Sequence, residues 1–288
     1  MLVIDAVGFR VGLDVPDAWI DPGFLPFACE GKPDAVVRLG KADALNRAGG
    51  ETYELQERVT VWPDAVRMLY REEEAILGTM LRREGLVPEI IAVSRDSVPA
   101  PAELMDAIKG SVYWLLQKRG VYVLHSASVI LDGQVFAFSA PSGTGKTTHA
   151  ALWRKVYRAE DFNGDQLAIC SGEYPVTAHG LPWCGSSGIA KKGAVPLGGV
   201  FFLERGSENR AEPVDGLKKL LLLSERMMAD HFTAGALSRT VRELEQSAQA
   251  LPCACLTCRM DEDAARVAVE YARRFMRREE RKNESTDP

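Results

Sequence analysis

Several features that would place this chain of 288 residues in other protein classes are missing. No apolar stretch approaches the roughly 20 residues that cross a bilayer. Basic residues are not in excess, because 35 Lys and Arg stand against 40 Asp and Glu, and the formal net charge is −5. The opening segment, Met1–Asp5, lacks the basic flank and the long apolar core of a signal peptide. These absences predict a cytoplasmic protein that binds neither membrane nor nucleic acid.

Cysteine is also scarce, with six residues, and three of them lie close together in the sequence. Cys253, Cys255 and Cys258 have a C-x-C-x-x-C spacing that could hold a metal ion as thiolates. The segment Leu251–Arg259 alternates like a strand, which puts the first two cysteines on one face and the third on the other. Three ligands do not easily converge from two faces, and no fourth ligand is evident nearby. Buried, reduced thiols are therefore the favoured interpretation, with a metal site as the alternative.

The rest of the composition, 46% apolar and 26% charged residues, is ordinary for a globular protein with a sizeable core. We expect a smaller β-rich N-terminal lobe over residues 1–100, a larger core over 101–278 and a flexible tail over 279–288. A joint at Val98–Pro101 would connect the first two parts, and an amphipathic helix over Glu103–Lys118 would follow it as the start of the core. Antiparallel strands of the lobe are predicted for Thr52–Leu55, Val59–Trp62 and Val66–Tyr70.

The most informative segment is Ala140–Thr147, with the sequence Ala-Pro-Ser-Gly-Thr-Gly-Lys-Thr. It matches the phosphate-binding loop pattern except at its first position, where Ala140 replaces glycine. In such a loop the backbone N–H groups point at a phosphate chain, the lysine adds a positive charge, and the hydroxyl of Thr147 is offered to Mg²⁺. The cofactors expected are therefore ATP and Mg²⁺. The residues expected to bind them are Ser142, Gly143, Thr144, Gly145, Lys146, Thr147 and Thr148.

The flanking sequence supplies the context that this motif requires. Val135–Phe138 is a short apolar run typical of a buried strand, and Thr147–Tyr157 has no helix breaker. Strand, glycine loop and helix in this order predict an α/β core whose helix adds a partial positive charge at the loop. Upstream, Asp132-Gly133 separates the β-rich run Val121–Leu131 from the loop strand, which predicts an antiparallel hairpin. A turn that binds nothing is the alternative for the loop.

A phosphate-binding loop also needs a carboxylate for Mg²⁺, and Asp165 is the best candidate. It follows Asn163-Gly164 and precedes an apolar run; its alternative role is that of a turn residue that caps its own backbone. In the Gly/Ser-rich segment from Gly185 to Gly193, Lys191 or Lys192 could neutralise charge on a transferring phosphoryl group, or could simply be solvated. His125 is a candidate acid–base group, or a satisfied histidine at a strand bend.

These motifs occur in order over residues 121–260, and together they resemble the HPr kinase/phosphorylase and PEP-carboxykinase superfamily. They are similar in particular to the stand-alone HPr-kinase-like proteins of modified-peptide gene clusters, including lasso-peptide serine kinases. The resemblance implies a P-loop core with a mixed sheet. It also implies Lys146 on the β- and γ-phosphates, Thr147 on Mg²⁺, and His125 as the histidine on the strand before the loop. The segment 185–193 would be the loop on the acceptor side.

Two positions depart from the family pattern. Ala140 replaces the first loop glycine, which is compatible with the fold if φ at that position is negative. The family usually carries two adjacent aspartates where this chain has Gly164-Asp165, one for the metal and one as the base that prepares the acceptor hydroxyl. Asp165 would then serve as metal ligand and as catalytic group, unless another residue takes one of these roles.

The sequence thus predicts an ATP- and Mg²⁺-dependent kinase with Asp165, Lys146, His125 and Lys192 as candidate catalytic residues, and Thr147 and Asp165 as metal ligands. Its acceptor would be a serine of a peptide or small protein, or a small hydroxylated molecule, and a homo-oligomer is compatible with the sequence. One alternative is a nucleotide-binding regulator with weakened catalysis, a pseudo-kinase. PEP carboxykinase chemistry ranks lower, because the chain is short and lacks a clear set of additional basic and metal-binding residues.

Overall fold

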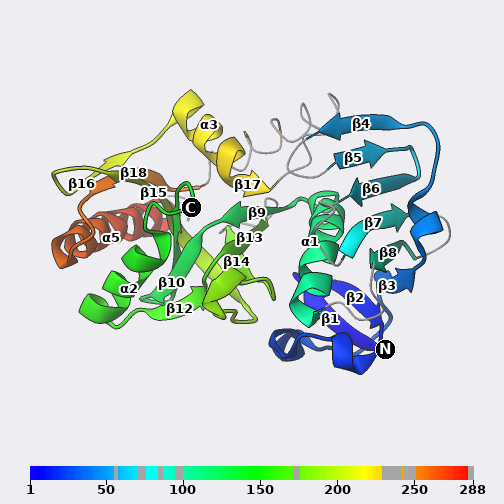
Figure 1. The fold of residues 1–288 in the computed structure, drawn as a ribbon. Coiled ribbons are helices and arrows are strands. Elements are labelled where there is room, and N and C mark those ends of the chain that lie inside the picture. Colours follow the sequence, from blue (N-terminus) through cyan, green and yellow to red (C-terminus); the bar gives the residue numbers. More distant parts are fainter. Residues whose placement is uncertain are drawn as a thin grey trace. The chain divides into compact units, whose positions relative to one another are not determined.

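The computed structural model describes residues 1–54, 58–69, 76–83, 87–94, 100–170, 176–228, 242, 245 and 251–284. These residues form a mixed α/β protein with two mixed β-sheets and few helices (Figure 1). One compact unit is built from Met1–Arg119, and a second begins at Gly120. The boundary therefore follows Arg119, and not residue 100 as expected. No helix in the described part of the chain is long and apolar enough to span a membrane.

The N-terminal unit contains a sheet of strand order β1-β2-β3-β8-β7-β6-β5-β4. Strands β4, β5 and β6 are antiparallel neighbours, as predicted, whereas β3 is parallel to both β2 and β8. Two predicted strand ends, Leu55 and Tyr70, and the joint residues Val98 and Pro99 lie outside the described residues. The strands are β1 (Leu2–Ala6), β2 (Phe9–Asp14), β3 (Ala35–Gly40), β4 (Glu51–Glu54), β5 (Arg58–Val61), β6 (Ala65–Leu69), β7 (Ile76–Arg82) and β8 (Glu89–Ser94); the 3-10 turns are η1 (Asp17–Trp19), η2 (Pro22–Phe27) and η3 (Ala42–Leu45).

Helix α1 (Pro101–Gln117) belongs to this first unit. Its apolar stripe, which includes Leu104, Ile108 and Val112, is buried, and the helix packs on β7 and β8. The helix was correctly predicted from its periodicity. Its assignment to the second part was not correct, because the periodicity defines an apolar face without identifying the sheet that covers it.

The long strand β15 lies in the middle of the sheet of the second unit. It pairs with β11 and β18 in one part of the sheet and with β14 in the other. The strand order is β12-β10-β11-β15-β14-β13-β9-β17, with β18 pairing with β15 and β16. The strands are β9 (Val121–His125), β10 (Ala127–Leu131), β11 (Gln134–Ser139), β12 (Glu160–Asn163), β13 (Gln166–Cys170), β14 (Thr177–Gly180), β15 (Ala194–Arg205), β16 (Arg210–Pro213), β17 (Met227–Met228) and β18 (Cys253–Cys258); the helices are α2 (Lys146–Tyr157), α3 (Gly216–Arg226) and α5 (Glu262–Glu284), with the 3-10 turn η4 (Gly185–Ser187).

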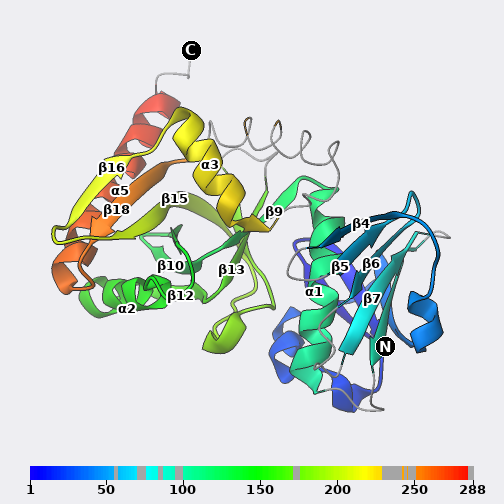
Figure 2. The same cartoon turned by 45° about the horizontal axis from the view of Figure 1, so that its top comes forward.

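Two apolar clusters lie on opposite faces of this sheet. On one face, Phe138, Trp153 and Phe201 belong to a cluster that includes alanines of α5. Helices α2 and α5 pack next to each other there (Figures 1 and 2). On the other face, Leu124 and Phe202 belong to a cluster that includes residues of β13 and α3. The sheet is thus covered on both faces where β11 and β15 run. This packing holds the ends of these two strands in place.

The predicted hairpin before the loop strand is confirmed. Strands β10 and β11 are antiparallel, and the turn residues Asp132 and Gly133 both have positive φ, 50° and 79°. This is the backbone of the tight turn that favours Asp-Gly between strands. The run expected as one strand, Val121–Leu131, is divided at Ser126 into β9 and β10. On its other side β11 is parallel to β15, so the carboxyl ends of these two strands meet at one edge.

The C-terminal helix α5 extends from Glu262 to Glu284 and so includes part of the segment, 279–288, that was expected as a flexible tail. The final residues, 285–288, lie outside the described part of the chain.

Candidate functional site

The loop between β11 and α2 adopts the backbone that close approach to a ligand requires. Gly143 and Gly145 have φ values of 74° and 118°, a region that is unfavourable for other residues. Ala140 is not among the residues with positive φ, so a side chain is tolerated at the first loop position, as expected. A Cβ at position 145 would lie 2.7 Å from Cε of Met260. The φ at position 145 therefore requires glycine, whereas the flexible end of the Met260 side chain could move aside.

Lys146 is the first residue of α2, and its side chain reaches back over the loop. Its Nζ donates a hydrogen bond to the carbonyl oxygen of Ala140 at 3.1 Å. Burial, the largest effect, lowers the pKa of Lys146; the negative charge of Asp165 opposes this shift, and the positive charge of Arg226 adds to it. Both charged groups therefore lie within electrostatic reach of the ammonium group.

Asn163 builds the turn that presents Asp165. Its Oδ1 accepts hydrogen bonds from the backbone N–H groups of Asp165 (3.0 Å) and Gln166 (2.9 Å), and its Nδ2 donates to the carbonyl oxygen of Leu181 at 2.8 Å. Asn163 is fully buried. The capping role that was the alternative for Asp165 thus belongs to Asn163, and the Asp165 carboxylate is left for other contacts.

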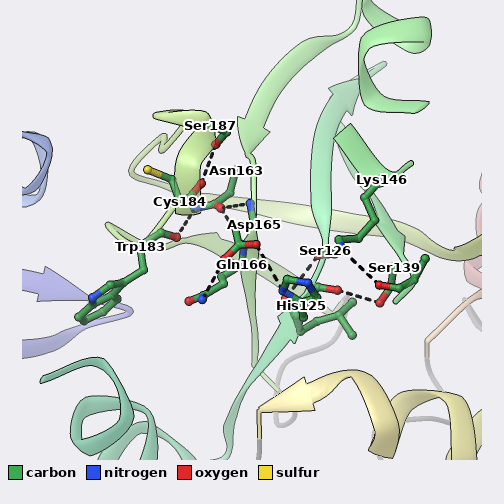
Figure 3. A network of polar contacts seen from close by, with 12 residues as sticks. His125, Ser126, Ser139, Lys146, Asn163, Asp165, Gln166, Trp183, Cys184 and Ser187 are labelled. Atoms are coloured by element: carbon green, nitrogen blue, oxygen red, sulfur yellow. Dashed lines mark hydrogen bonds and ion pairs between the residues drawn. The ribbon is translucent and has the colours of Figure 1, made fainter. Parts of the chain in front are cut away.

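The Asp165 carboxylate faces His125. Their Oδ1 and Nδ1 atoms are 3.4 Å apart, and Oδ2 accepts a hydrogen bond from Nε2 of Gln166 at 3.1 Å (Figure 3). The backbone of His125 is held as well, because its carbonyl oxygen accepts a hydrogen bond from Oγ of Ser139 at 2.8 Å. Ser139 is the last residue of β11, so this bond ties the histidine to the start of the loop.

A pocket of about 360 Å³, which we call the loop pocket, brings most of the predicted site residues together. Thr144 is the exception among the predicted loop residues: it does not line this pocket. Carboxylate and hydroxyl oxygens, from Asp165 and Thr147, are the donors that Mg²⁺ prefers, so the residues present fit this ion. The lining residues are His125, Ser142, Gly143, Gly145, Lys146, Thr147, Thr148, Gly164, Asp165, Cys184, Ser186 and Ser187.

Two predicted cations lie elsewhere. Lys191 forms an ion pair with Glu160, with Nζ and Oε2 2.7 Å apart, and neither Lys191 nor Lys192 lines the loop pocket. From this segment Ser186 and Ser187 line the pocket, together with Cys184, which directly precedes it. Lys192 is therefore not placed among the catalytic candidates by the structure.

A second pocket opens on the other side of the loop, at the carboxyl end of β15. This strand-end pocket, about 640 Å³ in volume, is lined by loop residues, by Phe202–Arg205 and by two residues of α3, Leu222 and Arg226. Nη2 of Arg205 donates a hydrogen bond to the carbonyl oxygen of Gly143 at 2.7 Å. Sequence reasoning missed these residues; the only signal was an apolar run, Val200–Leu203, that ends in Glu204-Arg205.

His149 lies in the first turns of α2 and is fully buried. Its Nε2 accepts a hydrogen bond from Nε1 of Trp153 at 3.2 Å, and burial lowers the pKa of His149 to about 4. An unfolded histidine has a pKa near 6.5. Between these two pH values the unfolded chain binds more protons than the folded one, so the free energy of unfolding decreases as the pH falls from 6.5 to 4.

We expect His149→Gln to flatten this pH dependence, since glutamine can accept the Trp153 hydrogen bond but does not titrate. Between pH 7 and pH 4 the free energy of unfolding of the variant should decrease by about 3 kcal/mol less than that of the parent protein. Urea unfolding of both proteins at several pH values measures it. Equal slopes for the two proteins would contradict the assignment of this pH dependence to His149.

The predicted burial of Cys253, Cys255 and Cys258 and their division between two faces of a strand agree with the structure. Cys253 and Cys255 belong to one apolar cluster and Cys258 to the other. Burial raises the pKa of Cys253 to about 12 and that of Cys258 to about 11. Thiols with such pKa values stay protonated at neutral pH. Among the described residues no group of three or more His, Cys, Asp or Glu side chains is arranged to hold a metal ion.

No protein-family model matches the chain, and no curated protein is significantly similar to it.

Proposed function

We propose that this protein is an ATP- and Mg²⁺-dependent phosphotransferase that phosphorylates a hydroxyl group. The observation that carries the proposal is the loop pocket, where a glycine loop with positive φ at Gly143 and Gly145 meets Lys146, Thr147 and Asp165. Backbone N–H groups and an ammonium group suit the phosphates of a nucleotide. Thr147 and Asp165 would hold the Mg²⁺, which neutralises charge on the phosphates when bound.

The proposal extends to the fold and the family. The loop strand β11 lies between an antiparallel neighbour, β10, and a parallel one, β15. This arrangement agrees with the P-loop core with a mixed sheet that the resemblance to HPr kinase and PEP carboxykinase implies. The acceptor we propose is a serine of a peptide or small protein, or a small hydroxylated molecule, and the site of action is the cytoplasm.

The role of His125 follows from its contact with Asp165. An imidazole nitrogen 3.4 Å from the carboxylate oxygen can hold the carboxylate in one orientation. The pair thus supplies an oriented carboxylate for the metal. This role does not require the histidine to touch the acceptor.

Isothermal titration with ATP tests the proposal at its first step. We expect Mg²⁺-dependent binding that is abolished by EDTA, and transfer of label from γ-labelled ATP to at least one member of a panel of serine peptides and small alcohols. Lys192→Ala is the matched control. Because Lys192 does not line the loop pocket, this variant should bind ATP within about twofold of the parent protein.

The results separate the proposal from its rival. Binding of ATP without transfer to any acceptor would favour the nucleotide-binding regulator. The absence of any nucleotide binding would overturn both.

A further inference from the structure

The surroundings of Gly164 leave no room for a second carboxylate at the position directly before Asp165. A Cβ built at this position would overlap Oγ of Ser187. That hydroxyl donates a hydrogen bond to the carbonyl oxygen of Cys184 at 2.6 Å and accepts one from the N–H of Ile189 at 3.1 Å. The space beside Asp165 at position 164 is therefore filled, and a second carboxylate would have to come from another element.

Strand β15 supplies such a carboxylate on the other side of the loop. It runs parallel to β11, and Phe202 pairs with Ser139, the last residue before the loop. Glu204, two positions further, is exposed and lines the strand-end pocket together with Ser142 and Gly143. Its Oε1 accepts a weak hydrogen bond from Sγ of Cys255 at 3.7 Å. The carboxylate is thus placed by the neighbouring strand β18, on which Cys255 lies.

Arg226 adds a cation to the same pocket. It is the last residue of α3, and the strand β17 that follows pairs with β9, which fixes the end of the helix. The side chain is 22% exposed and contacts Glu225, with Nη2 and Oε2 3.5 Å apart. Its charge also acts on Lys146, as described above. Arg226 therefore lies beside the loop in the strand-end pocket, and Lys146 lies beside it in the loop pocket.

The residues that line the two pockets distinguish their roles. In a phosphate-binding loop the backbone N–H groups hold the phosphates, the lysine reaches the β- and γ-phosphates, and the hydroxyl of the next residue binds Mg²⁺. Thr147 and Thr148, at the helix end, line only the loop pocket, whereas Ser142 and Gly143 line both pockets. The strand-end pocket thus adjoins the half of the loop that lies away from Thr147 and Thr148, which leaves it for the group that attacks a bound phosphate in line.

We infer that the strand-end pocket receives the acceptor alcohol, with Glu204 as the base for its hydroxyl and Arg226 as the cation that neutralises the transferring phosphoryl group. The inference rests on the proposed phosphotransferase function. In the step, the acceptor oxygen forms a bond to the γ-phosphorus, and the bond from this phosphorus to the β–γ bridging oxygen breaks. The electron pair of that bond leaves on ADP, and the hydroxyl proton moves to the Glu204 carboxylate.

This assignment gives the roles of metal ligand and of base for the acceptor to two different residues, so that Asp165 does not have to perform both. Asp165 and Thr147 serve the metal in the loop pocket, and Glu204 serves the acceptor in the strand-end pocket. It also replaces Lys191 and Lys192 by Arg226 as the source of positive charge at the reacting phosphate. Phe202 and Leu222, which belong to the same apolar cluster and line this pocket, indicate an acceptor with an apolar part beside its hydroxyl.

Glu204→Gln and Arg226→Ala test this inference in the full-length chain, with water as the acceptor and slow ATP hydrolysis as the reaction. We expect Glu204→Gln to lower kcat roughly 10²-fold and Arg226→Ala to lower it roughly 10³-fold, with the KM for ATP little changed. A second readout is binding of ADP with Mg²⁺ and aluminium fluoride, a mimic of the planar phosphoryl group. Arg226→Ala should weaken this complex at least tenfold more than it weakens ADP alone.

The matched controls are Glu212→Gln and Arg210→Ala on β16, an exposed pair 3.1 Å apart that does not line the pocket. Both should behave like the parent protein. If the parent protein hydrolyses ATP and neither Glu204→Gln nor Arg226→Ala changes kcat or the fluoride complex, the inference is overturned and the proposed function stands. If the parent protein binds no Mg-ATP, the proposed function fails and the inference with it.

Discussion

Replacing Lys146 by methionine should remove most of the nucleotide affinity and nearly all phosphoryl transfer. Methionine keeps the length and the apolar stem of the side chain but has no charge. Charge-assisted hydrogen bonds contribute about 1.5–3 kcal/mol each, so the affinity for Mg-ATP should fall roughly 10- to 100-fold. Because charge on the phosphates increases during transfer, turnover should fall further, roughly 10²- to 10³-fold in addition. Calorimetry and label transfer measure the two effects separately.

The fold should tolerate this substitution. Lys146 makes one hydrogen bond within its own loop, to Ala140, and its pKa is already lowered by burial, which means that the ammonium group is held at some cost to the folded state. The urea midpoint of Lys146→Met should therefore equal or exceed that of the parent protein. If this variant is stable and transfers phosphate at the rate of the parent protein, Lys146 has no role in the reaction. A collapse of stability would instead show that the side chain is structural.

Local signals in the sequence were sufficient to predict the structural elements around the candidate site. The Asp132-Gly133 turn, the strand Val135–Phe138 and the glycine loop are each determined by residues close in sequence, and the structure confirms all three elements. The opposite faces of Cys253 and Cys258 follow in the same way from the period of a strand. For these elements local preference and tertiary packing agree.

The features that sequence reasoning missed depend on contacts between distant segments. Glu204 reaches the loop only because β15 lies parallel to β11, and Arg226 only because α3 ends beside β9. Lys192 was favoured for its charge and its flexible loop, yet its neighbour Lys191 pairs with Glu160 on β12, away from the loop pocket. Composition identifies a cation, but only strand pairing shows which pocket it can enter.

Introducing an aspartate at position 164, which would restore the pair of adjacent aspartates, should destabilise the protein instead of activating it. The new side chain would overlap Oγ of Ser187, and its Cβ would lie 2.5 Å from the Ser187 Cβ. Ser187 cannot turn away without losing its bonds to Cys184 and Ile189, which contribute roughly 1 kcal/mol each. Together with the typical penalty for overpacking, Gly164→Asp should cost about 3–5 kcal/mol in the free energy of unfolding.

The double variant Gly164→Asp/Ser187→Gly separates steric conflict from the chemistry of the added carboxylate. Removal of the Ser187 side chain creates the space, so the double variant should recover a large part of the lost stability, measured by urea unfolding. Ser187→Gly alone is the control for the lost hydrogen bonds. If the single variant Gly164→Asp were as stable as the parent protein, the contact between Ser187 and position 164 would be wrong. The double variant could also be stable and yet transfer phosphate no faster than Ser187→Gly. The loop pocket then needs no second carboxylate, as expected when Glu204 supplies this group from β15.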